Sequence, residues 1–246
     1  MIKQTYLTNN DCYKNGRWIV PQGIILHSVG SPYSSAQGFV DYWNKPNFDR
    51  CVHAFIDSNN GDVYQTLPWA YRGWHAGGSA NNTHIGVEMC ESEFLKYKPN
   101  SAEFTVDPKD KSKAQAQIIL AYHSAVCLFA DLCARFGLDP EKDGVILSHR
   151  EAGQRGIASG HVDPEHVWIG LNLPFTMDAF RKDVKNKMRH PFVDVAPGSW
   201  YADAVQWCYE NGIINGVDET HFKPDKMATR AELATIIYRL YCHIAK

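Results

Sequence analysis

The chain has 246 residues, 44% of them hydrophobic and 21% charged, which is ordinary for an enzyme-sized domain with a small second unit. Its formal net charge of −2 argues against nucleic acid as a partner, because phosphate binding needs a basic face. No apolar run approaches the roughly 20 residues that span a bilayer, so we expect no membrane insertion.

Short β-branched and apolar runs alternate with helical patterns over the first 188 residues. The runs predict strands at 24–26, 52–56, 63–66, 85–89 and 145–147, with a hairpin turn at 59–62. Helical spacing predicts helices at 34–43, 112–136 and 176–188, the long one ending before Gly137. Residues 1–188 are therefore predicted to form an α/β domain, a central mixed β-sheet flanked by helices.

Composition changes in residues 189–246. Helices are predicted at 201–210 and 230–241, joined by a glycine-rich turn and loops. This small all-α unit has too few apolar residues for a generous core of its own. We expect it to pack on other copies of the chain or on the first domain.

Polar residues stand at the ends of several predicted strands. His27 closes one apolar run and His149 another, while Glu88 lies in a third and Asp163 follows farther along the chain. Two imidazoles and a carboxylate are a common ligand set for catalytic zinc, and a second carboxylate can serve as general base. The pattern predicts a metal-dependent hydrolase. Two alternatives stay open: structural histidines, and a salt bridge from Glu88 to an arginine.

The seven cysteines are scattered and include no Cys-x-x-Cys pair, which favours reduced thiols. The first ten residues have neither the apolar core nor the small-residue cleavage site of a signal peptide. We therefore expect synthesis in the cytoplasm without a signal peptide.

Several stretches resemble, in family order, the type-2 N-acetylmuramoyl-L-alanine amidases, relatives of bacteriophage amidase lysozymes and peptidoglycan recognition proteins. They are IILHS (24–28), CVHAFID (51–57), YRGWHAG (71–77), NNTHIGVE (81–88) and SHREA through GHVDP (148–164). The resemblance implies the amidase/peptidoglycan recognition fold. It also implies hydrolysis of the amide between N-acetylmuramic acid and L-alanine of the peptidoglycan stem peptide.

The same resemblance implies site roles. His27, His149 and Asp163 match the ligands of one zinc ion, and Glu88 matches the general base. His161 stands where the family commonly has a lysine that stabilises the oxyanion, so it is the second candidate catalytic residue. As a good ligand type, it is also able to replace Asp163 on the metal.

Three further residues are expected in the cleft wall as substrate-binding residues: Trp74, His75 and Asn81. Val52 stands where phage members of the family carry a tyrosine. We therefore assign no tyrosine role.

Residues 192–246 resemble a single S-layer homology repeat, through FVDV (192–195), WYADAV (200–205), GIING (212–216), FKPD (222–225) and TRAEL (229–233). Such repeats usually occur in threes and bind a pyruvylated secondary cell-wall polymer. The resemblance implies polymer contacts by Trp200 and Arg230, and a homotrimer through residues 192–246 would rebuild the binding unit. The alternatives are a tail packed on the first domain, a core Trp200 and a helix cap at Thr229.

We interpret the sequence as a zinc-dependent peptidoglycan amidase with a wall-targeting repeat. The expected lack of a signal peptide favours a phage or prophage endolysin that acts at the bacterial cell wall after release. Two other functions stay open, a non-catalytic peptidoglycan-binding protein and a cytoplasmic muropeptide-recycling amidase. The tail argues against the second, which needs no wall-binding repeat.

Overall fold

The computed structural model describes residues 2–188, 192–196, 199–218 and 220–245. The chain divides into two compact units, Met1–Lys185 and Asn186–Lys246. The predicted boundary between residues 188 and 189 adjoins residues 189–191, which lie outside the described residues. That exact boundary stays a prediction.

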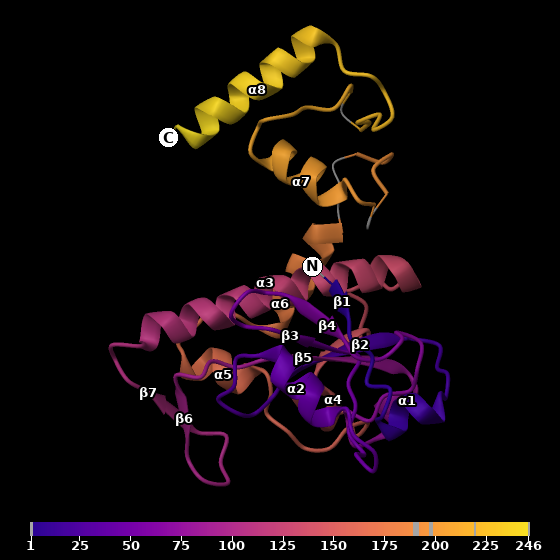
Figure 1. Ribbon diagram of the computed structural model, residues 1–246, viewed down its shortest axis with the longest axis vertical. Coiled ribbons are helices and arrows are strands. Elements are labelled where there is room, and N and C mark those ends of the chain that lie inside the picture. Colours follow the sequence, from indigo (N-terminus) through magenta and orange to yellow (C-terminus); the bar gives the residue numbers. More distant parts are fainter. Residues whose placement is uncertain (1, 189–191, 197–198, 219, 246) are drawn as a thin grey trace. The chain divides into compact units, whose positions relative to one another are not determined.

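A six-stranded sheet forms the centre of the first unit (Figure 1). Its strands, in spatial order, are β1 (Ile2–Gln4), β4 (Val63–Gln65), β3 (Ala54–Ile56), β5 (His84–Met89), β2 (Gly23–Ser28) and β8 (Ile146–Ser148). All neighbours pair in parallel except β3 and β4. The turn between these two contains Gly61 at φ 75°, a conformation that glycine adopts without strain. The predicted mixed sheet is confirmed.

Helices cover both faces of this sheet, with α3 (Lys111–Phe136) along one side and α2 (Ala36–Trp43) and α4 (His149–Gln154) on the other (Figure 1). The remaining elements of this part are α1 (Asp11–Asn15), η1 (Ser79–Asn82), the hairpin of β6 (Leu95–Tyr97) and β7 (Phe104–Val106), α5 (Glu165–Gly170) and α6 (Met177–Met188). By length and composition alone α3 is apolar enough to cross a membrane. Its buried Ile118, Tyr122 and Phe129 identify it as a core helix.

The strand register sets three functional residues side by side. His27 in β2 pairs with Glu88 in β5, and Leu26 pairs with Ser148 in β8, so His149 follows at nearly the same level. Ser148 forms a capping box with Glu151, which makes His149 the first residue of α4. Because these strands are parallel, their carboxyl ends meet at one edge of the sheet, where clefts commonly open.

The second unit contains α7 (Ala202–Glu210) and α8 (Arg230–Ile244), and its described residues include no strand. Its core is small: Phe192, Val195, Ala202 and Val205. Asp194 links the segment before α7 to the loop between α7 and α8, since its carboxylate accepts the backbone N–H groups of residues 222 and 223 at 2.8 and 2.7 Å. These elements confirm the expected small all-α unit.

Candidate metal centre and catalytic cleft

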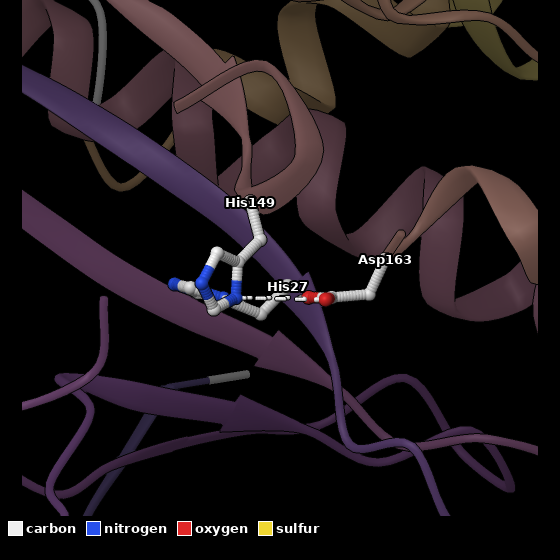
Figure 2. Close-up of side chains that lie close together, drawn as sticks. All are labelled: His27, His149 and Asp163. Atoms are coloured by element: carbon white, nitrogen blue, oxygen red, sulfur yellow. Dashed lines mark hydrogen bonds and ion pairs between the residues drawn. The ribbon is translucent and has the colours of Figure 1, made fainter. Parts of the chain in front are cut away.

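Three buried side chains converge at the carboxyl edge of the sheet (Figure 2). His27 comes from β2, His149 begins α4, and Asp163 lies just before α5. The two Nδ1 atoms are 3.0 Å apart, and each faces the Asp163 carboxylate, at 3.4 Å for His27 and 3.5 Å for His149. The structure thus brings together all three residues predicted as metal ligands.

The spacing of these donor atoms fits a zinc ion. Ligands at about 2.0–2.1 Å in a tetrahedral arrangement lie about 3.3 Å from one another. The two histidine Nδ1 atoms are 3.0 Å apart, and they lie 3.4 and 3.5 Å from Oδ2 and Oδ1 of Asp163 respectively, which are separations close to that value. Two nitrogens and one carboxylate oxygen are also a common donor set of catalytic zinc, which keeps a fourth position open.

The electrostatics favour the ligand forms of these groups. Burial alone would raise the pKa of Asp163, but the adjacent His149 and His27 imidazoles have the larger effect and lower this pKa to well below its ordinary value. Burial lowers the pKa of His27, and the adjacent Asp163 carboxylate partly opposes this effect. An ionised carboxylate and a neutral imidazole are the forms that bind a metal.

Glu88 lies next to the three ligands, in β5, and lines the adjacent cavity. Its Oε2 is enclosed and has no hydrogen-bond partner among the described residues. Burial raises its pKa well above the ordinary value, and the nearby Asp163 and Glu91 carboxylates add to this effect. Because an enclosed, unpartnered carboxylate oxygen is costly, Glu88 is a strong candidate for a reacting group.

A cavity of about 720 Å³ opens over this edge of the sheet, with Glu88, Tyr97, His149 and His161 in its wall. The His161 ring stacks on that of His149, with centroids 4.2 Å apart and planes 20° from parallel. Its Nδ1 lies 3.8 Å from Asp163, and its side chain is 55% exposed. Burial and the nearby His149 lower its pKa. His161 therefore stands beside the three converging ligands rather than among them.

The predicted wall residues have different environments. Trp74 is 43% exposed, lines the cavity and stacks against the Arg72 guanidinium at 4.6 Å. His75 also lines the cavity, but its Nδ1 lies 3.0 Å from Nε2 of His27. Asn81 is fully buried, and its Oδ1 accepts the N–H groups of residues 75 and 76 at 2.9 Å. Asn81 therefore supports a turn of the backbone.

A buried glutamate that the sequence analysis missed organises the same edge. Glu91 accepts hydrogen bonds from Ser28 Oγ at 2.7 Å, the Gly30 N–H at 3.0 Å and the Tyr97 hydroxyl at 2.6 Å. Burial raises its pKa to about 7, although these hydrogen bonds oppose the shift. Glu91 thus holds the chain after His27 and one side of the cleft. The only sign of this role in the sequence was that Glu91 lies three residues beyond Glu88, just after the same predicted strand.

In the second unit, Trp200 is 94% exposed, so the alternative of a core tryptophan is wrong. Arg230 is exposed at the start of α8, where the capping box of Thr229 and Glu232 is present. A cavity of about 540 Å³ is lined in part by Lys223 and Arg239. Neither of the two predicted polymer contacts lines it.

Two family models match the chain. The model described as N-acetylmuramoyl-L-alanine amidase matches residues 17–166, and that of the S-layer homology domain matches residues 191–234. A bifunctional autolysin of Staphylococcus epidermidis is 32% identical over 96 residues, 37% of this chain and 7% of that protein. The surface-layer 125 kDa protein of Lysinibacillus sphaericus is 48% identical over 46 residues, 19% of this chain and 4% of that protein. The chain thus spans less than a tenth of the length of these curated relatives.

Solved structures show the same fold. The Staphylococcus aureus hydrolase AmiA, solved with its ligand, has a TM-score of 0.56 at 22% identity, covering 76% of this chain and 83% of its own. The catalytic domain of XlyA has a TM-score of 0.52 at 22% identity, covering 75% and 99%. The PlyG catalytic domain has a TM-score of 0.52 at 18% identity, covering 76% and 94%. The predicted fold class is confirmed.

Proposed function

Because the chain belongs to the N-acetylmuramoyl-L-alanine amidase family, we propose that it hydrolyses the amide between N-acetylmuramic acid and L-alanine of the peptidoglycan stem peptide. One observation carries the proposal: the convergence of His27, His149 and Asp163 beside an unpartnered Glu88. This arrangement combines a metal site with a base at the edge of an open cleft.

We assign one zinc ion to the three ligands. Bound there, zinc would supply Lewis acidity, which activates water near neutral pH and polarises a carbonyl group. Asp163 fits the third ligand position better than His161, because its carboxylate is buried and lies 3.4–3.5 Å from Nδ1 of both histidines, whereas the His161 side chain is 55% exposed. His161 therefore stays free for a role toward the substrate.

The protein's own groups would move the proton and bind the substrate. Glu88 accepts a proton from the attacking water and returns it to the leaving amine, a task that suits a carboxylate with a raised pKa. His161, exposed in the cleft wall, donates a hydrogen bond to the developing oxyanion. Trp74 offers an exposed ring to the substrate. Asn81 contributes indirectly, through the turn that it holds.

Mass spectrometry of digested Gram-positive peptidoglycan tests this function. The zinc-loaded enzyme should release stem peptides with free L-alanine amino termini and leave the glycan strands intact. A zinc chelator should abolish the release, and added zinc should restore it. Undigested walls of several types, despite bound zinc, would contradict the proposal and favour a non-catalytic peptidoglycan-binding protein.

We further propose that residues 192–246 bind a secondary cell-wall polymer, an extension that the S-layer homology match supports. Lys223 and Arg239 bring positive charge to the cavity of this unit, which suits an anionic polymer. Cosedimentation with walls before and after removal of the polymer tests the idea. Binding should require the polymer and weaken in Trp200→Ala or Arg230→Ala. Equal binding to stripped walls would contradict it.

Self-association of three copies through residues 192–246 completes this proposal. Within its unit α8 buries no residue, and it leaves Leu233, Ile237 and Tyr241 more than half exposed. Exposed apolar groups on one helix are typical of an interaction surface. Sedimentation equilibrium should give about three times the chain mass of 27.8 kDa, and Ile237→Lys should give the monomer. A monomeric wild type would contradict the proposal.

A further inference from the structure

A hydrogen-bond relay leads from His27 to the backbone. Its Nδ1 faces the other two ligands, and its Nε2 lies 3.0 Å from Nδ1 of His75. The Nε2 of His75 lies 3.1 Å from the carbonyl oxygen of His84. A carbonyl only accepts, so a neutral His75 carries its proton on Nε2 and accepts on Nδ1. His27 must then donate from Nε2, which leaves its Nδ1 unprotonated.

A second relay acts on His149 in the same way. Its Nε2 lies 3.2 Å from Oγ of Ser159, and that Oγ lies 3.2 Å from the carbonyl oxygen of Ala76. The serine hydroxyl donates to the carbonyl and accepts from the imidazole. The Nδ1 of His149 is therefore unprotonated as well.

Together the relays leave no proton between the converging ligand atoms. Two imidazole lone pairs 3.0 Å apart then face each other and the Asp163 carboxylate. Such a group of acceptors is unfavourable when buried, unless a cation lies among them. The relays thus prepare both histidines as Nδ1 ligands.

The position of His75 is fixed from two sides. Asn81 accepts its backbone N–H at 2.9 Å. On the other side, Gly86 in β5 leaves room for the imidazole, since a Cβ there would lie 2.4 Å from Cγ of His75. Gly86 is two residues from Glu88, so a side chain at either position would point to the same face of the sheet. The absence of a side chain at Gly86 therefore leaves the space in which the His75 ring contacts His27.

We propose that His75 and Ser159 are positioning residues that fix the tautomers of His27 and His149, so that both bind the metal through Nδ1. This inference rests on the zinc amidase function proposed above. It assigns His75 to the support of the metal site, in place of the substrate contact expected from the sequence.

Nitrogen-15 NMR of the zinc-loaded wild-type chain tests the tautomers without any substitution. His27 and His149 should each show a metal-bound Nδ1 and a protonated Nε2. His75 should show a protonated Nε2 and an unprotonated Nδ1. A proton on Nδ1 of His75, or zinc on Nε2 of either ligand, would overturn the inference.

Zinc affinity, measured by competition with a chromophoric chelator, tests the energetic role. His75→Leu and Ser159→Ala should each weaken binding about 10- to 100-fold. His75→Asn should restore most of the affinity, because its Oδ1 can take the place of the accepting Nδ1. Ser101→Ala is the matched control: this serine lines the same cavity, and its Oγ accepts the nearby Glu103 N–H at 3.0 Å.

Unfolding of the metal-free variants separates positioning from a merely structural role. Ser159→Ala should unfold like the wild type without zinc and gain less stability when zinc is added. Wild-type zinc affinity in both His75→Leu and Ser159→Ala would overturn the inference and leave the amidase proposal intact. A wild-type chain that binds no zinc would instead overturn the proposed function, and the inference with it.

Discussion

Substitution of Gly86 by alanine perturbs the metal site without touching a ligand. The added Cβ would lie 2.4 Å from Cγ and 2.5 Å from Nδ1 of His75. Carbon atoms in contact lie at about 3.5–4.0 Å, so something must move by about 1 Å. Because β5 is held between β2 and β3, the imidazole is the part that moves.

A shift of this size breaks the relay to His27. It would lengthen the contact between the two imidazoles from 3.0 Å to about 4 Å, beyond hydrogen-bond range. Overpacking of this kind costs about 1–3 kcal/mol of stability. Loss of a hydrogen bond to a ligand should weaken zinc binding about 10- to 100-fold.

Chelator competition and denaturant unfolding measure the two effects separately. Gly160→Ala is the control, because a Cβ at that position meets no atom of the described residues within 4 Å. It should keep the zinc affinity of the wild type. Wild-type affinity in Gly86→Ala, or an equal loss in Gly160→Ala, would refute the reasoning.

Three further predictions concern the carboxylates and the exposed histidine. Glu88→Gln should lower kcat about 10²- to 10⁴-fold with zinc affinity unchanged, and a normal kcat would exclude Glu88 as the base. His161→Ala should lower kcat about 10²-fold and leave zinc binding unchanged. If the variant failed to bind zinc, His161 would be a metal ligand and not an oxyanion-stabilising residue. The pKa of Glu91 is about 7 in the folded chain, above its ordinary value of 4.5, so the folded state favours the protonated carboxyl. Its contribution to the free energy of unfolding is therefore complete below about pH 4.5, and about 3 kcal/mol of it is lost as pH rises through about 7. Hydrogen exchange of the β2 amides in the metal-free protein measures this loss of stability, and Glu91→Gln should abolish it. An unchanged pH dependence of exchange in the variant would contradict the prediction.

The fold was largely predictable because the main elements have clear periodicity. The five predicted strands correspond to β2, β3, β4, β5 and β8, and the five predicted helices to α2, α3, α6, α7 and α8. The pieces that were missed are short, such as β1, β6 and β7 with three residues each. The equally short β3, β4 and β8 are buried throughout, whereas the missed strands are partly exposed and lack a continuous buried run. The spatial order of strands also depends on distant pairing, such as β1 with β4.

The site was predictable where chemistry coincides with strand ends. His27, Glu88 and His149 follow buried apolar runs, and parallel register then sets them side by side. The support for these residues was not predictable. The environment of His75 depends on the gap left by Gly86, which only the three-dimensional packing reveals. Likewise, a polar loop residue gives no sign in sequence of whether it faces the cleft or, like Asn81, the backbone.

Titration of the metal-free enzyme with zinc, with stem-peptide release as the readout, tests the central claim most directly. Release should rise in proportion to added zinc and level off at one ion per chain. Asp163→Ala should stay inactive over the same range. Full release by the metal-free protein, or a rate that ignores added zinc, would contradict the zinc-dependent amidase account.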